Sequence, residues 1–94
     1  MDKKYLKFLE KKEQIYNNKD LTIEQQVEQI YAINKSYLLS LTKHNQVATI
    51  AIYDLITTML SASYKKDYVE KYFAINSKLE ELIKAAREIQ GDEE

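Results

Sequence analysis

The chain has 94 residues, of which 45% are hydrophobic and 31% are charged. A chain of this length encloses one hydrophobic core, so we expect a single helical domain over residues 1–94. The sequence has no proline, no cysteine and one glycine, Gly91, which disfavours tight-turn β architectures, disulfide scaffolds and cysteine-ligated metal sites. The net charge of -1 removes the general electrostatic attraction on which most nucleic-acid binders depend.

The amino-acid usage also indicates a location and a type of source. Residues 1–20 mix lysines with acids, whereas a signal peptide has an uninterrupted apolar region after its basic start, so we expect a cytoplasmic protein. The least charged stretch, residues 45–64, contains several threonines and serines and is too polar to span a membrane. The strong excess of lysine over arginine is typical of AT-rich coding sequence and indicates a low-GC bacterium, or one of its phages or plasmids.

The first half of the chain predicts two amphipathic helices. Apolar and aromatic residues recur at three- and four-residue spacings from about Asp2 to Asn17. Thr22 followed by Gln25 forms a capping box, so the second helix begins near Ile23. Its apolar stripe loses regularity over residues 43–46, where we predict a turn or a kink.

The second half of the chain predicts two further helices. From residue 47 to residue 62, apolar side chains occupy more than half of the helix circumference, which predicts a third helix buried on most sides. Asp67 and Glu70 form a second capping box that opens the last helix, and Gly91 stands where a C-terminal cap is expected, before a short acidic tail over residues 91–94. Short connections favour antiparallel neighbours, so the sequence predicts an all-α, antiparallel four-helix bundle.

Two windows of the sequence resemble each other at an offset of 42 residues. Residues 27–34 and 69–76 are identical at five of eight positions. Either the bundle arose from a duplicated helical hairpin, with the second and fourth helices as equivalent members, or two amphipathic helices match by coincidence. Asn34 and Asn76 occupy equivalent positions, where each amide either bonds across the bundle and fixes helix register or lies on the surface.

Catalytic and metal-binding patterns are missing from the sequence. The only histidine, His44, has no cysteine and no carboxylate at a helical ligand spacing, and the single glycine excludes a phosphate-binding loop. The carboxylate pairs lie among lysines, as on a solvated helix face, and we expect Asp54 to be exposed as well. We therefore predict a protein that is not an enzyme and has no catalytic residues, no bound metal and no cofactor.

Tyrosine is the most distinctive component of the sequence, with eight copies. Three of them form an i, i+4, i+8 ladder flanked by lysines at the start of the last helix. One interpretation is core packing with the hydroxyls reaching solvent, and the other is a recognition face, because tyrosine is enriched in binding hot spots. The candidate partner-binding residues are Tyr64, Lys65, Lys66, Tyr68, Lys71 and Tyr72.

The chain resembles the small bacteriocin immunity proteins of the enterocin A type, which protect producer cells from their own class IIa peptide. The resemblance lies in size, lysine-rich helical composition and the pattern from Ile30-Tyr31 through Leu55-Ile56 to residues 62–66. It implies an antiparallel four-helix bundle that acts without catalysis at the inner membrane face, where it engages a sugar-transporter membrane subunit with bound bacteriocin. It also implies that specificity lies in the C-terminal half of the chain.

Two other functions remain open from the sequence. The chain is alternatively a phage, plasmid or mobile-island accessory protein that binds and inhibits or redirects a host or helper protein. A nucleic-acid-associated bundle is disfavoured by the near-neutral charge, unless the charges segregate onto separate faces. The apolar third helix is covered either by the other helices of the chain or by a second copy. A homodimer is therefore compatible with each of these functions.

Overall fold

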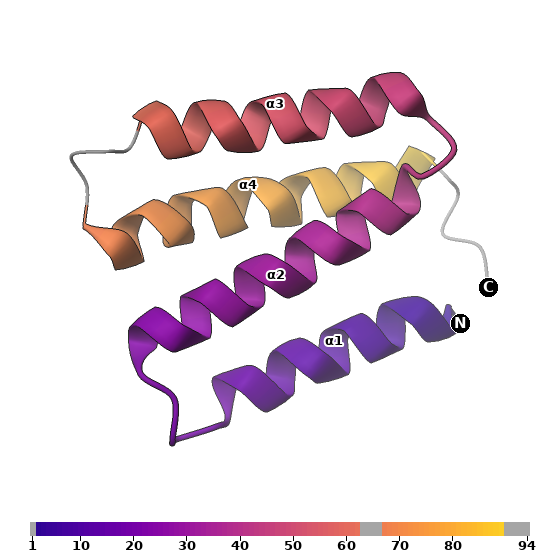
Figure 1. The fold of residues 1–94 in the computed structure, drawn as a ribbon. Helices are drawn as coiled ribbons and strands as arrows, with labels where there is room; N and C mark the ends of the chain where they lie inside the picture. Colours follow the sequence, from indigo (N-terminus) through magenta and orange to yellow (C-terminus); the bar gives the residue numbers. More distant parts are fainter. Residues whose placement is uncertain (1, 63–66, 90–94) are drawn as a thin grey trace.

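The computed structural model describes residues 2–62 and 67–89. These residues form four α-helices, α1 (Lys3–Tyr16), α2 (Ile23–Leu41), α3 (Gln46–Ala62) and α4 (Tyr68–Ile89). Consecutive helices run in opposite directions, so that α2 and α4 run parallel to each other (Figure 1). The predicted all-α helical bundle with antiparallel neighbours is confirmed.

Local capping interactions fix the helix starts that the sequence predicts. The Thr22 hydroxyl accepts a hydrogen bond from the Gln25 backbone N–H at 3.1 Å, and the Gln25 side chain accepts one from the Thr22 backbone N–H at 2.9 Å. At the start of α4, the Asp67 carboxylate accepts a hydrogen bond from the Glu70 backbone N–H at 2.9 Å. Each bond satisfies an N–H group that has no partner within its own helix.

The turn predicted at residues 43–46 separates α2 from α3. The side chain of Asn45 accepts a hydrogen bond from the Ala48 backbone N–H at 3.0 Å and so caps the start of α3. The predicted C-terminal cap at Gly91 and the acidic tail over residues 91–94 lie outside the described residues.

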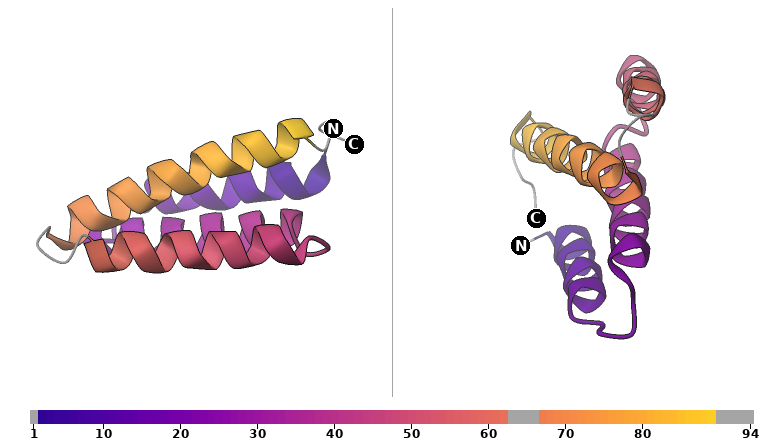
Figure 2. Two further views of the ribbon diagram at one scale, coloured as in Figure 1. Left: turned by 90° about the horizontal axis from the view of Figure 1, so that it is seen from above. Right: turned by 90° about the vertical axis from the view of Figure 1, so that its left-hand side faces the viewer.

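The four helices form a thin, zigzag layer. Seen along the helices, their order is α3, α4, α2, α1, and the closest packing is between α2 and α4, with α1 on α2 and α3 on α4 (Figure 2). The Cα atoms span 36 × 30 × 15 Å. Their radius of gyration of 13.8 Å exceeds the value of about 12.4 Å expected for a compact domain of this length. In this layer, the outer helices α1 and α3 lie at opposite edges of the central parallel pair α2 and α4.

All four helices contribute to one hydrophobic core. Its most buried members come from the facing sides of α2 and α4, and α1 and α3 add one or two side chains each. The buried cluster consists of Phe8, Tyr37, Leu38, Ile52, Ile56, Ile75, Leu79 and Ile83.

Asn34 and Asn76 are buried between α2 and α4, with 0% and 6% of their surface exposed. The Asn34 amide N–H donates to the Asn76 side-chain oxygen at 3.2 Å, and the Asn76 amide N–H donates to the Val27 carbonyl at 3.2 Å. Of the two alternatives, bonding across the bundle is therefore correct. The equivalent positions of the 42-residue repeat therefore meet between α2 and α4. The origin of the bundle from a duplicated helical hairpin stays a prediction.

The prediction that the third helix is buried on most sides is wrong. Only Ile52 and Ile56 of α3 are buried, whereas Val47, Ile50 and Tyr53 are 79%, 51% and 47% exposed. The physical reason is the position of α3 at one edge of the layer, where it packs mainly on α4 and meets no other helix of residues 2–62 and 67–89 on its outer side (Figure 2). Asp54 is exposed, as expected.

Candidate functional site

The start of α4 carries the described part of the predicted tyrosine ladder. Tyr68 and Tyr72 are half-buried, and their ring centroids lie 4.9 Å apart. Tyr72 also meets Tyr31 of α2 edge-on at 5.2 Å. Lys71 is half-buried on the same helix. The other three predicted residues, Tyr64, Lys65 and Lys66, lie outside the described residues.

The fold extends this ladder across three helices. The Lys35 ammonium of α2 lies 5.7 Å from the ring centroid of Tyr31 and 5.5 Å from that of Tyr53 on α3. We call the five residues Tyr31, Lys35, Tyr53, Tyr68 and Tyr72 the tyrosine surface. Sequence reasoning missed the first three members because they lie outside α4, Tyr31 and Lys35 on α2 and Tyr53 on α3. The only available signal was that Tyr31 lies in the first copy of the 42-residue repeat and Tyr72, the last residue of the ladder, lies in the second.

One member of the tyrosine surface, Tyr68, also holds two helices together through a hydrogen bond. The Tyr68 hydroxyl donates to the Glu28 carboxylate of α2 and so ties the start of α4 to α2. This bond is the main reason that the pKa of Tyr68 is raised above its ordinary value, because a neighbouring carboxylate disfavours the phenolate. Tyr72 packs against the core, whereas Tyr53 keeps 47% of its surface exposed. In the tyrosine surface, Tyr68 and Tyr72 are therefore held in place by the fold, whereas the ring of Tyr53 is accessible.

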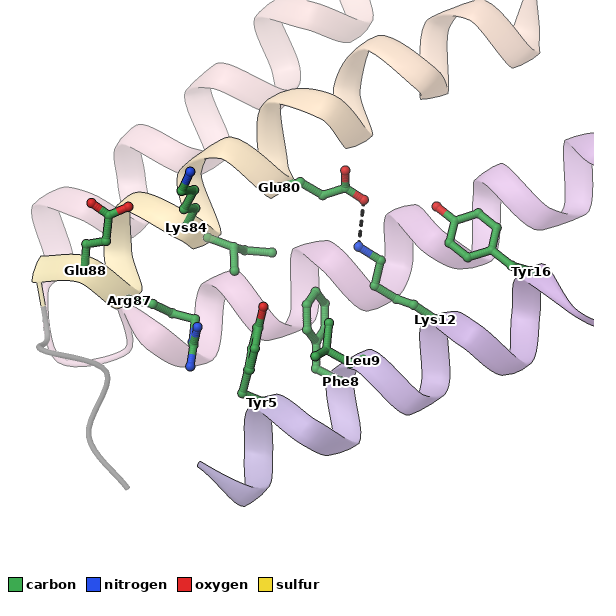
Figure 3. Close-up of a pocket in the computed structure, with 10 residues that line it drawn as sticks. Tyr5, Phe8, Leu9, Lys12, Tyr16, Glu80, Lys84, Arg87 and Glu88 are labelled. Carbon is green, nitrogen blue, oxygen red and sulfur yellow. Dashed lines mark hydrogen bonds and ion pairs between the residues drawn. The ribbon is translucent and has the colours of Figure 1, made fainter. Parts of the chain in front are cut away.

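A groove of 630 Å³ lies between α1 and α4 and contains stacked cation–aromatic pairs (Figure 3). The Lys12 ammonium forms an ion pair with the Glu80 carboxylate at 2.6 Å and lies 4.9 Å from the Phe8 ring centroid. The Arg87 guanidinium lies 3.4 Å from the Tyr5 ring centroid. The Lys12–Glu80 ion pair and the Arg87–Tyr5 pair join α1 to α4, so these side chains are internal contacts of the fold.

A second groove, which we call the apolar groove, has a volume of 510 Å³ and lies between α3 and α4 at the C-terminal end of α2. Alanine, leucine and isoleucine side chains make up most of its wall. Of the described residues that line it, none is ionisable. The lining residues are Leu38, Leu41, Thr42, Asn45, Ala48, Ala51, Ile52, Leu55, Leu82, Ala85, Ala86 and Ile89.

Residues 2–62 and 67–89 contain no group of three or more histidine, cysteine, aspartate or glutamate side chains arranged to hold a metal ion. Within the same ranges, no helix has both the length and the apolar character needed to cross a membrane. His44 lies exposed in the turn between α2 and α3.

Comparison with protein-family models, with curated proteins and with solved structures finds no match to this chain.

Proposed function

We propose that this chain is a non-catalytic protein-binding module that acts through its tyrosine surface, and that it serves as a bacteriocin immunity protein in the producer cell. The observation that carries the proposal is a run of contacts across three helices, in which Lys35 and Tyr31 of α2 meet Tyr53 of α3 and Tyr72 of α4. Tyr31 and Tyr53 each lie within 6 Å of the Lys35 ammonium, at 5.7 and 5.5 Å. Tyrosine provides a large contact area at low entropic cost and is enriched in binding hot spots.

The chemistry of the tyrosine surface suits a protein partner. Half-buried rings supply apolar contact area, and the Lys35 ammonium supplies one charge for an acidic group or a carbonyl on the partner. Three of its five members belong to α3 and α4, in the C-terminal half where the resemblance to immunity proteins places specificity. The proposed partner is a sugar-transporter membrane subunit with bound bacteriocin, met at the inner membrane face.

A protection assay tests both the function and the surface. The full chain is expressed in a bacteriocin-sensitive, low-GC strain that is then exposed to class IIa peptides. We expect survival to rise at least tenfold, and a Lys35→Ala, Tyr53→Ala double variant to lose that protection while keeping its thermal melting. A Thr57→Ala variant, at another exposed position of α3, is the matched control and should protect like the parent chain. Absence of protection against every peptide of the class contradicts the immunity function.

A pull-down separates immunity from the mobile-element function. The tagged chain is incubated with lysate that contains membranes, with and without class IIa peptide, and the bound proteins are identified by mass spectrometry. Peptide-dependent recovery of a sugar-transporter membrane subunit supports immunity. Recovery of one soluble replication, packaging or defence protein regardless of peptide would instead assign the chain to phage, plasmid or mobile-island accessory proteins.

A further inference from the structure

The most apolar helix of this bundle is also poorly covered by it. α3 has the largest share of apolar side chains among the four helices, and its only charged side chain is Asp54. A helix with this composition is normally buried on most of its surface. Here Val47 and Ile50 are 79% and 51% exposed, and only two α3 side chains are buried. The rest of the chain, as the structure describes it, therefore leaves much of the apolar surface of α3 without a cover.

The uncovered side of α3 continues into the apolar groove. Ala48, Ala51 and Leu55 line the groove from α3, and Leu82, Ala85 and Ile89 line it from α4. Ile89 at the rim is 86% exposed, and both alanines at positions 51 and 85 are exposed as well. One continuous surface thus contains a hollow of 510 Å³ and projecting apolar side chains beside it.

We propose that a second copy of this chain covers this surface, so that the protein forms a symmetric dimer through α3 and the C-terminal half of α4. In a twofold dimer the same patch meets itself, so the patch has to contain both the projections and the hollow that receives them. Val47 and Ile89 are the projections, and the apolar groove is the hollow.

The charge distribution favours a second copy over a charged partner. A residue close to the axis of a twofold dimer meets its own copy, so a charged residue there would face a like charge at a cost in free energy. The groove has no ionisable residue among its described lining, so two copies approach without this repulsion. An acidic or basic partner, in contrast, finds no opposite charge in the groove to recognise.

The α3–α4 half of one broad face is large enough to hold a stable dimer interface. Treated as a box with the Cα extents of 36 × 30 × 15 Å, the molecule has about a quarter of its accessible surface of 6669 Å² on each broad face, which leaves roughly 850 Å² for the α3–α4 half. A standard stable interface buries about 800 Å² from each partner.

The dimer surface and the tyrosine surface occupy different sides of α3. Ala51 and Tyr53 are two residues apart on a helix that turns by about 100° per residue, so their side chains point about 200° apart. Dimerisation therefore leaves Tyr53 accessible, and the inference does not depend on the proposed immunity function. Each can fail without the other.

Sedimentation equilibrium of the full chain, from about 5 µM to about 500 µM, tests the dimer. We expect the mass to rise from that of a monomer to that of a dimer across this range. Ala51→Glu and Ala85→Glu should each weaken the dimer at least tenfold, because they place a carboxylate on both sides of the interface. Both alanines are exposed in the single chain, so these variants keep the monomer fold, which circular dichroism checks. Thr57→Glu and Ser77→Glu are the matched controls, since they add the same charge at exposed positions outside the groove.

Cysteine labelling supplies a second measurement. The sequence contains no cysteine, so Ala51→Cys carries a single thiol. Its reaction with a maleimide should slow at high protein concentration, whereas that of Thr57→Cys should not change. A parent chain that stays monomeric at about 500 µM overturns the proposal, and so does a dimer that survives both groove substitutions.

Discussion

Two buried asparagines connect the central helices of this bundle. Asn34 and Asn76 share a 3.2 Å hydrogen bond, and the second amide also reaches the Val27 carbonyl. The Asn34 side-chain oxygen has no hydrogen-bond partner within the part of the chain that the structure describes. Buried amides cost desolvation free energy, and their usual benefit is a fixed register between helices. The pair therefore favours one alignment of α2 against α4 over alignments shifted by a helical turn.

Removal of one amide should destabilise the bundle more than removal of both. Asn76→Leu leaves the Asn34 amide without its acceptor in the interior, which should lower the free energy of unfolding by about 1–3 kcal/mol. The double variant Asn34→Leu, Asn76→Leu has no unpaired amide at this place and should recover most of that loss. Urea unfolding of the three chains measures the difference. A double variant that is less stable than the single one by the full cost of a second substitution contradicts this account.

The hydrogen bond from Tyr68 to Glu28 makes stability depend on alkaline pH. The pKa of Tyr68 is raised in the folded chain, chiefly by this bond, from the ordinary value of 10.0. A group with a raised folded pKa contributes its stability fully below the unfolded pKa and loses it as the pH rises above that value. The melting temperature should therefore fall above a pH of about 10. In Tyr68→Phe the fall should be smaller, and Glu28→Gln should reduce it similarly.

Thermal melting followed by circular dichroism between about pH 8 and about pH 11.5 checks this prediction. Burial also raises the pKa values of Tyr16 and Tyr37, and these tyrosines are present in every variant. The difference between parent and variant curves consequently reports Tyr68 alone. Parallel curves for the parent chain and Tyr68→Phe would show that the bond has no net effect on stability.

At the scale of elements, α1 depends on a few large contacts. It buries only Phe8, whose ring stacks on Tyr37 of α2 with a centroid distance of 4.3 Å and an interplanar angle of 15°. The Tyr5–Arg87 stack and the Lys12–Glu80 ion pair connect the same helix to α4 (Figure 3). A short helix with a polar outer surface has little stability of its own, so these contacts decide whether α1 stays docked.

Substitution of Phe8 should therefore loosen α1 before the rest of the bundle. Phe8→Ala removes the buried ring and should lower the free energy of unfolding by about 3 kcal/mol. Hydrogen exchange should accelerate most in α1, because α2 and α4 keep their mutual packing. Leu6→Ala is the matched control on the same helix, since Leu6 is 40% exposed and should change stability only slightly. Uniform acceleration over all helices would show that α1 and the central pair unfold together.

At the scale of the whole molecule, the layer arrangement has a direct consequence for folding stability. The central helices α2 and α4 pack on each other and each has an outer helix as a second neighbour, whereas α3 at the edge keeps apolar surface in contact with water. Covering that surface by a second copy transfers it out of water and stabilises the folded state by mass action.

The melting temperature should consequently rise with protein concentration. A hundredfold increase in concentration should raise it measurably for the parent chain and for Thr57→Glu, and should have no effect on Ala51→Glu. Differential scanning calorimetry at two concentrations makes the comparison. A melting temperature that is independent of concentration in all three chains would contradict the proposed dimer.

The sequence by itself determined the helices of this protein and where they begin. The capping residues Thr22 and Gln25, and likewise Asp67 and Glu70, act within a few positions of each other, so their effect is readable from the chain. The equivalence of Asn34 and Asn76 was also visible in the sequence, although the repeated window left open whether they lie inside or outside. Only the tertiary structure decided the order α3, α4, α2, α1, the exposure of Val47 and Ile50, and the meeting of Tyr31 and Tyr53 around Lys35. The physical reason is that periodicity reports which side of a helix is apolar, whereas burial depends on how many neighbours that helix meets, and long-range packing alone sets that number.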